Sequence, residues 1–274
     1  MRLVSLASGS DGNSTYIGSE KTHILVDAGI SNKKIETRLN ELGLCGKDIS
    51  GVFLTHEHSD HIAGLEVFVR KNEIPVFASR GTLEYLKDRD KYSRISDYFN
   101  IIDSKNNIIL GDLNIKAFDI DHDANEPFGY RVECGDKKMA VATDLGRYTK
   151  DIVKNLTDLD ALLVEANHDI RMLETGPYPY ELKRRILSNK GHLSNENSGK
   201  IITELWNEEV KQIFLGHLSD ENNMPELALE TVRCELLMEH KDFEAYTKLI
   251  VANRNTVSER VIIKAEEIAG NKSA

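Results

Sequence analysis

The chain has 274 residues, a hydrophobic content of 40% and a mean hydropathy of −0.39, which predict an ordinary water-soluble globular protein. Its formal net charge of −10 argues against a protein whose whole surface binds nucleic acid. The charge does not exclude a nuclease, because divalent ions bound at a site can themselves receive phosphate groups.

The cysteines and the apolar runs indicate a cytoplasmic protein. Cys45, Cys134 and Cys234 are odd in number and far apart, so neither a disulfide framework nor a thiolate zinc site is indicated. We interpret them as reduced, buried cysteines. The N-terminal run Met1–Ala7 is too short for a signal peptide, and no apolar run approaches the roughly 18 residues of a membrane span.

Short apolar runs predict strands, and longer runs with helical spacing predict helices. In chain order the predicted strands are Arg2–Ala7, Ser14–Gly18, His23–Asp27, Gly51–Thr55, Pro75–Ala78, Asn106–Leu110, Asn114–Ile120, Gly129–Cys134, Lys137–Ala142, Ala161–Glu165, Lys211–Leu215 and Tyr246–Ala252. The predicted helices are Ser31–Leu42, His61–Asn72, Ser79–Asp88, Thr149–Leu156, Pro179–Ser188, Ser194–Glu208 and Pro225–His240. Ser31, Ser194 and Asn223 are expected to be N-caps, and Pro225 suits a first helical turn.

The order of these elements predicts one domain over residues 1–274. Early strands follow one another closely and later strands alternate with helices. This order favours an α/β (α+β) architecture with two mixed β-sheets and outer helices. The polar tail from about Glu266 is expected to fray.

The segment His56–His61 is the strongest chemical signal in the chain. It places three imidazoles and an aspartate directly after the apolar run Gly51–Thr55. Divalent metals bind neutral imidazole nitrogens and carboxylate oxygens, and loops at strand ends commonly carry binding sites. The segment therefore predicts a metal site at the end of a buried strand.

Three later residues, His122, Asp144 and His217, also follow short apolar runs. The pattern His-x-His-x-Asp-His, followed by a single His, Asp and His in this order, resembles the metallo-β-lactamase-fold superfamily. The resemblance covers nearly the whole chain. It implies a four-layer αβ/βα sandwich with metals in a cleft at one edge of the two sheets.

The resemblance also implies two divalent ions, zinc or manganese, and a division of the ligands between them. The implied ligands are His56, His58 and His122 for the first ion, Asp60, His61 and His217 for the second, and a bridging Asp144. Two such ions can share a water, lower its pKa and hold a substrate oxygen, and Asp60 would orient the attacking hydroxide. Glu57 is expected to support this site or to lie on the surface rather than to bind a metal.

A second pair of residues, Glu165 and His192, resembles a Glu-Ala pair and a downstream His-x-Ser in the tRNase Z-related phosphodiesterase branch. There the glutamate orients the histidine, which serves the leaving oxygen or the phosphate. A phosphodiester expels a poor leaving alkoxide, so a positioned proton donor helps its cleavage. We therefore expect Asp60, Glu165 and His192 to take part in catalysis. The alternatives for His192 are phosphate binding alone or a structural role.

Further substrate contacts are suggested near these residues. Ser194, as an N-cap, would place a helix N-terminus and its free N–H groups beside the phosphate. His168 is either a polar contact in the cleft or structural. Lys183, Arg184 and Arg185 either touch a nucleic-acid backbone or form the solvated face of a helix. The residue pattern leaves these alternatives open.

Three short runs narrow the resemblance to the bacterial YycJ-type (WalJ-type) group: residues 8–14, His-Asp-Ala at 122–124 and two copies of Gly-His-Leu-Ser. That group implies a 5′-to-3′ exonuclease on double-stranded DNA with a part in mismatch repair. The alternative is a small-molecule hydrolase, namely a cyclic nucleotide phosphodiesterase, a thioesterase or a lactonase. Seven candidate ligands argue against a non-catalytic module. The sequence leaves the oligomeric state and the native metal open.

Overall fold

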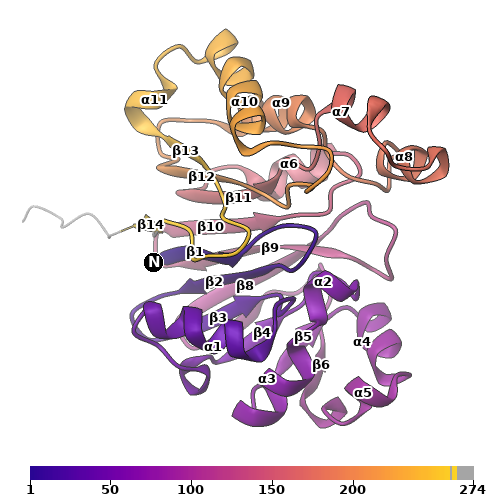
Figure 1. The fold of residues 1–274 in the computed structure, drawn as a ribbon. Coiled ribbons are helices and arrows are strands. Elements are labelled where there is room, and N and C mark those ends of the chain that lie inside the picture. The colour runs from indigo at the N-terminus through magenta and orange to yellow at the C-terminus, as the bar shows by residue number, and fades with distance from the viewer. Residues whose placement is uncertain (260, 264–274) are drawn as a thin grey trace, which may run out of the picture.

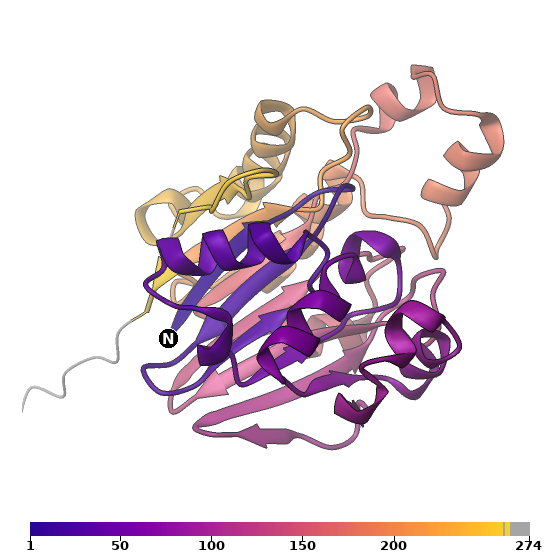
Figure 2. The same cartoon turned by 60° about the horizontal axis from the view of Figure 1, so that its bottom comes forward.

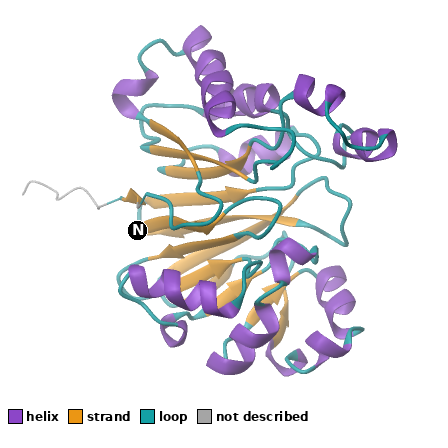
Figure 3. Cartoon of the chain, viewed as in Figure 1, coloured by secondary structure: helices purple, strands orange, loops and turns teal. Residues whose placement is uncertain are grey.

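The computed structural model describes residues 1–259 and 261–263, so the tail expected to fray from Glu266 lies outside the described residues. Within the described residues, the strands form two seven-stranded sheets that pack face to face. Helices cover both outer faces of this sandwich (Figures 1 and 3). The predicted architecture of two mixed sheets with outer helices is confirmed.

Sheet A has the strand order β14-β1-β2-β3-β4-β5-β6. Pairs from β14 to β3 are antiparallel, and pairs from β3 to β6 are parallel. The strands are β1 (Arg2–Ala7), β2 (Ser14–Gly18), β3 (His23–Val26), β4 (Gly51–Phe53), β5 (Val76–Ala78), β6 (Phe99–Ile101) and β14 (Val261–Ile262).

Sheet B repeats this plan with the order β13-β12-β11-β10-β9-β8-β7. Pairs from β7 to β10 are antiparallel, and pairs from β10 to β13 are parallel. The strands are β7 (Ile108–Leu110), β8 (Leu113–Asp119), β9 (Phe128–Cys134), β10 (Lys137–Ala142), β11 (Ala161–Glu165), β12 (Gln212–Gly216) and β13 (Lys248–Val251).

The helices occupy the connections between strands. They are α1 (Asn32–Glu41), α2 (Ser59–Ile62), α3 (Leu65–Asn72), α4 (Arg80–Lys87), α5 (Asp90–Ser93), α6 (Lys150–Leu156), α7 (Ile170–Thr175), α8 (Tyr180–Ile186), α9 (Asn195–Leu205), α10 (Pro225–Glu239) and α11 (Phe243–Tyr246), with 3-10 turns at Gly46–Asp48 and Ser96–Tyr98. In the part of the chain that the structure describes, no helix has the length and apolarity to cross a bilayer.

Strands that are apolar on both faces explain the four layers. In β10, Met139 and Val141 face the core between the sheets, while Ala140 and Ala142 face the core beneath the helices. One outer core packs sheet A against α1, α3 and α4, and the other packs sheet B against α6, α9 and α10. Each fully buried aliphatic side chain contributes about 1.5–3 kcal/mol, so three cores hold four layers together.

The predicted helix His61–Asn72 is wrong in its extent, because the segment forms two helices, α2 and α3. The chain between them packs against the segment that follows β3. The Gly64 N–H donates to the Ala28 carbonyl, and a Cβ on Gly64 would lie 2.0 Å from the Ile30 oxygen. A residue with a side chain does not fit there, so the glycine permits this close approach.

Five short elements were not predicted from the sequence. These are β6, β14, α5, α7 and α11. The N-caps Ser31 and Ser194 are confirmed, since each side chain accepts a hydrogen bond from the backbone three residues later. The prediction for Asn223 is wrong: Met224 occupies the N-cap of α10, and the Asn223 amide donates to the Ala166 carbonyl.

The prediction that the cysteines are buried is also wrong. Cys45 and Cys234 are exposed, and Cys134 is partly exposed; all three are free thiols. Cys45 precedes the 3-10 turn at Gly46–Asp48, and Cys234 lies on the solvent side of α10. Cys134 packs against the core between the sheets without being fully buried, and Cys45 and Cys234 face solvent.

Candidate metal centre

The candidate centre lies where strands of both sheets end. The loop His56–His61 follows β4, His122 follows β8, Asp144 follows β10 and His217 follows β12, while Glu165 is the last residue of β11. These strand ends meet at one edge of the sandwich, which is where open α/β sheets place their ligands. The fold thus brings together residues that are up to 161 positions apart (217 minus 56).

The first group of side chains is His56, His58 and His122, with one ring nitrogen of each within 4.8 Å of the others. The His122 Nε2 lies 3.3 Å from the His58 Nδ1. The His56 ring centre lies 4.5 Å from that of His58 and 4.9 Å from that of His122. These three residues are the set that the resemblance implies for one ion, and their role as ligands stays a prediction.

The second group is Asp60, His61 and His217. The Asp60 Oδ2 lies 3.2 Å from the His61 Nε2 and 3.3 Å from the His217 Nε2. Asp144 reaches both groups: its Oδ2 is 3.3 Å from the His61 Nε2, and its Oδ1 is 3.7 Å from the His122 Nε2. All seven expected ligands therefore converge on one place.

Two buried atoms of the centre suit a metal ion. The His56 Nε2 and the Asp144 Oδ2 have no hydrogen-bond partner among the described residues, although buried polar atoms are normally paired. Burial, helped by the neighbouring imidazoles, lowers the pKa of His56 well below its ordinary value. A neutral imidazole is the form that binds metals, and imidazoles with carboxylates suit zinc or manganese.

Asp60, His61 and His217 favour one another's charged forms. Burial alone would raise the pKa of Asp60, but His61 and His217 lower it well below its ordinary value. Burial alone would lower the pKa of His61, but Asp60, Asp144 and Asp27 raise it well above its ordinary value. A cation bound between these carboxylates would replace the imidazole protons, so metal binding should release protons.

Asp27 is a residue of this site that sequence reasoning missed. It is buried, and its Oδ2 accepts hydrogen bonds from the His61 Nδ1 at 2.8 Å and the Thr55 Oγ1 at 2.9 Å. Its Oδ1 accepts from the Thr55 N–H at 2.8 Å. This carboxylate fixes the ring of His61 so that Nε2 faces Asp60, the support that metal-binding histidines usually have.

Glu165 supports two histidines rather than the one expected. Its Oε1 accepts from the His192 Nδ1 at 2.8 Å and from the His217 Nδ1 at 2.7 Å. Its Oε2 accepts from the backbone N–H groups of Leu145 at 2.9 Å and Leu193 at 3.1 Å. Four donors engage this carboxylate, which suits Glu165 to positioning its neighbours. Its carboxylate also lies within 4.8 Å of ligand atoms of Asp144, His192 and His217, a further group that could hold an ion.

Three residues of the centre have left-handed backbone conformations: Asp27 with φ 63°, Asp144 with φ 60° and His217 with φ 55°. Such a conformation costs about 1–2 kcal/mol per residue with a side chain, so the surroundings must hold it. At His217 the N–H donates to the Ser8 hydroxyl, and the Asn167 side chain donates to the carbonyl. These two hydrogen bonds hold the backbone of His217 in this conformation.

Glu57 supports the loop that follows His122. It is buried, and its Oε1 accepts from the Asn125 N–H at 2.8 Å and the Asn125 side chain at 2.7 Å. Its Oε2 accepts from the Thr82 hydroxyl on α4 at 3.2 Å. The carboxylate is thus engaged by these groups and belongs to neither cluster of candidate ligands.

His192 stands between two cavities. One, of about 230 Å³, is lined by Asp60, Asp144 and His192 from the candidate centre. The other, of about 200 Å³, is lined by His168 and Ser194. His168 is buried, and burial lowers its pKa to about 4, so it is neutral at physiological pH. His168 and Ser194 therefore line a different cavity from Asp60 and Asp144, and His192 lines both.

The three basic residues of α8 have different surroundings. Arg185 lines the cavity of about 230 Å³. The Lys183 Nζ donates to two backbone carbonyls of its own segment, at Glu174 and Gly176. The Arg184 guanidinium lies 5.8 Å from the ring of Tyr180. The structure thus brings only Arg185 of these three to the cleft.

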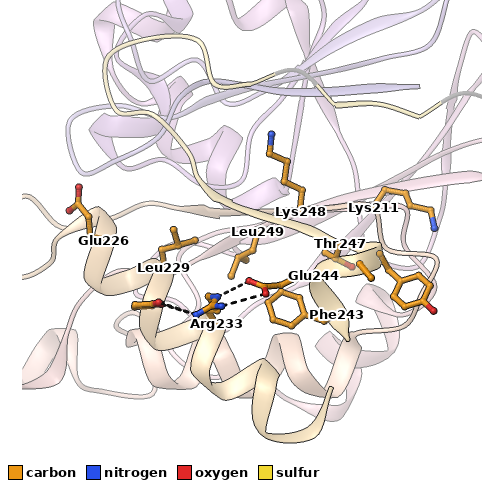
Figure 4. A pocket seen from close by; sticks show the side chains of 12 residues that line it. Lys211, Glu226, Leu229, Arg233, Phe243, Glu244, Thr247, Lys248 and Leu249 are labelled. Carbon is orange, nitrogen blue, oxygen red and sulfur yellow. Dashed lines mark hydrogen bonds and ion pairs between the residues drawn. The ribbon is translucent and has the colours of Figure 1, made fainter. Parts of the chain in front are cut away.

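The largest of the described cavities, about 830 Å³, lies between α10, α11 and β13 and shares no lining residue with the candidate centre (Figure 4). Three of its charged side chains pair with one another: the Arg233 Nε donates to Glu244 at 2.6 Å, and the Arg233 Nη1 donates to Glu230 at 3.2 Å. No histidine lines it, so it offers no catalytic set of groups.

Comparison with known families agrees with this geometry. The model of the beta-lactamase superfamily domain matches residues 22–217. The chain belongs to this superfamily. The solved metallo-beta-lactamase fold protein YhfI from Bacillus subtilis superposes with a TM-score of 0.66 at 14% identity, over 94% of this chain and 99% of that one. The four-layer metallo-β-lactamase sandwich is therefore confirmed.

Two curated relatives are much closer in sequence. The chain is 40% identical over 242 residues to exodeoxyribonuclease YycJ of Bacillus anthracis, covering 87% of this chain and 89% of that protein. It is 39% identical over 228 residues to exodeoxyribonuclease WalJ of Streptococcus pneumoniae, covering 83% and 85%. The resemblance to the YycJ-type (WalJ-type) group is thereby confirmed.

Proposed function

We propose that the chain is a phosphodiesterase that uses two divalent ions, zinc or manganese, and degrades double-stranded DNA as a 5′-to-3′ exonuclease. The observation that carries this proposal is the carboxylate of Glu165. It holds His217, a candidate ligand, and His192, which is not one of the seven expected ligands, at 2.7 and 2.8 Å. A histidine fixed beside a metal cluster is what phosphodiester cleavage needs for its leaving group. The relatives named exodeoxyribonuclease support DNA as the substrate.

His192 has the geometry of a proton donor. Glu165 engages its Nδ1, so Nε2 is the nitrogen left for a ligand. The side chain is 16% exposed and lines the cavity shared with Asp60 and Asp144. We assign Nε2 to the leaving oxygen of the substrate, where it donates a proton or binds the phosphate.

The two candidate ligand groups would serve the attack of water on the phosphate. Divalent ions held by them would lower the pKa of a water and bind phosphate oxygens. Asp60, whose side chain is 20% exposed, opens onto the cavity and can orient the attacking water. Asp144 is fully enclosed and keeps the two groups together.

A small-molecule hydrolase is the second candidate function. The cavity at the centre has only about 230 Å³, and α8 contributes to its wall. The net charge of −10 also favours a small substrate over a long polyanion. A thioester or lactone needs less help with its leaving group than a phosphodiester does, so the Glu165–His192 pair argues against those two substrates.

A panel of substrates tests the proposal. Purified chain is supplied with zinc or manganese and incubated with duplex DNA labelled at the 5′ or 3′ end, single-stranded DNA, RNA, a cyclic nucleotide and a thioester. We expect the 5′ label of the duplex to be released first, and EDTA to stop the reaction. Turnover of the cyclic nucleotide or the thioester without any cleavage of nucleic acid would favour the second candidate.

Replacement of His192 tests its assigned role. His192→Ala should keep the bound metals and slow cleavage of duplex DNA by about 10²–10⁴-fold, the usual range for general acid–base catalysis. Metal content by elemental analysis and the rate of release of the 5′ label are the two measurements. Unchanged cleavage with unchanged metal would remove His192 from the mechanism.

A further inference from the structure

We propose that Arg185 binds a phosphate group flanking the cleaved one, and that Asp123 occupies the Arg185 guanidinium until the substrate displaces it. This inference rests on the proposed function, because it supposes a substrate with more than one phosphate. Arg185 would then favour substrates with several phosphate groups over substrates with one.

The position of α8 suits such a contact. In Figures 1 and 2, α7 and α8 project from the body of the sandwich, beyond sheet B. From this projecting segment, Tyr178, Leu182 and Arg185 line the same cavity as Asp60 and His192. A chain of nucleotides that reaches His192 therefore passes alongside α8.

A phosphate backbone that enters this cavity requires a positively charged side chain to bind it. Asp60 and Asp144 line it, and carboxylates repel a phosphate backbone. Among the described residues that line this cavity, Arg185 is the only lysine or arginine. An arginine offers a planar fork of N–H donors that matches phosphate oxygens, and its charge is permanent.

The partner of Arg185 is Asp123, which lies outside α8 in the loop after β8. The Arg185 Nε donates to the Asp123 Oδ2, and Asp123 directly follows His122 in the loop between β8 and β9. The Asp123 Oδ1 lies 3.3 Å from the His122 Nε2. This ion pair therefore joins the projecting α8 to the loop that carries a candidate metal ligand.

A phosphate can replace Asp123 in this pair. The side chains of Arg185 and Asp123 are 52% and 29% exposed, and ion pairs with this exposure are weak. The hydrogen bonds of Arg185 to described residues use only Nε, so its two terminal amino groups can receive a phosphate first. A phosphate that binds the guanidinium through Nε and one amino group must then displace Asp123 from Nε. Asp123 and a phosphate oxygen then compete for one guanidinium.

Competition predicts opposite effects at the two positions. Arg185→Ala removes the binding group and should raise KM for duplex DNA by about 10- to 100-fold, the loss expected for a charge-assisted hydrogen bond. Asp123→Asn removes the competitor and should lower KM by up to about fivefold. A purely structural ion pair would be weakened by both changes and would shift KM in the same direction.

The experiment measures kcat and KM for 5′-labelled duplex DNA and for bis-p-nitrophenyl phosphate, with metal content and thermal melting recorded for every variant. Arg184→Ala is the matched control on the same helix and should leave KM unchanged. Arg185→Ala should lower kcat/KM for bis-p-nitrophenyl phosphate, which has a single phosphate group, by a smaller factor than for the duplex. It should also reduce the slope of log(kcat/KM) against log salt for the duplex by about 0.9, the share of one phosphate contact.

Each outcome decides the inference. Equal KM values for Arg185→Ala and Arg184→Ala, while the wild type degrades the duplex, would overturn the inference and leave the proposed function intact. Loss of bis-p-nitrophenyl phosphate cleavage in Arg185→Ala would place Arg185 in the metal machinery instead. Should Arg185→Ala fail to fold, Arg185→Lys keeps the charge without the fork and should raise KM by a smaller factor. A wild type that cleaves no DNA overturns the proposed function and the inference together.

Discussion

The two sheets build their halves of the candidate metal centre in different ways. Sheet A contributes one loop, His56–His61, in which four candidate ligands fall within six residues. Sheet B contributes its residues singly, one at the end of each of several strands. A local loop can be recognised by spacing, whereas the contribution of sheet B depends on the order and register of its strands.

Each half also has its own buried carboxylate. Asp27 holds one imidazole, that of His61, and two groups of Thr55. Glu165 holds two imidazoles, those of His192 and His217, and two backbone N–H groups. The sheet B half therefore couples a candidate ligand to the proposed proton donor, and the sheet A half does not.

Loss of the group between the two halves should have the largest effect. Asp144→Ala removes the carboxylate that faces both ligand groups, so we expect loss of bound metal and of nearly all turnover. Elemental analysis and the duplex assay measure the two effects. Asp136→Ala, in the exposed turn between β9 and β10, is the control. Retention of two ions per chain in Asp144→Ala would contradict a bridging role.

Glu165→Gln should have the next largest effect. A glutamine amide turns an NH2 group toward N–H donors that the carboxylate now accepts, so several of these hydrogen bonds are lost. We expect the loss in kcat to match that of His192→Ala, about 10²–10⁴-fold, with metal affinity weaker by about 10- to 100-fold. Metal titration measures the loss of metal affinity, and kinetics at saturating metal then measure the loss of kcat separately. A normal kcat at saturating metal would contradict the proposal that Glu165 couples His217 to His192.

Asp27→Asn should have the smallest effect of the three. Among the imidazoles only that of His61 loses its partner, so metal affinity should fall by about 10- to 100-fold, while kcat at saturating metal stays close to that of the wild type. The same metal titration and kinetic assay apply. A fall in kcat as large as that of Glu165→Gln would contradict the proposal that only the sheet B carboxylate supports the proton donor.

The sequence predicted most of the buried elements because their apolar runs are continuous. The bounds of β1, β2, β10 and β11 agree with the predictions residue for residue. Strand β6 was missed because it is only three residues long and its side chains are half-buried or exposed. The break at Gly64 was missed because it depends on the carbonyl of Ile30, which another part of the chain supplies.

The supporting residues of the centre could not be derived from spacing. Asp27 was predicted as a strand end, but the pairing of Val26 with Phe53 is what brings it beside Thr55 and His61. Likewise, the pairing of Glu165 with Gly216 places His217 next to the Glu165 carboxylate. Both supports arise from strand register, which local sequence does not encode.

The left-handed backbone at Asp27, Asp144 and His217 limits how this protein can adapt to heat. Glycine at these positions would relieve the steric conflict, yet it would delete the side chains on which the proposed activity depends. A screen that selects for melting temperature alone would therefore enrich inactive variants here. Thermostable variants that keep the activity must improve the three cores or the exposed helices instead.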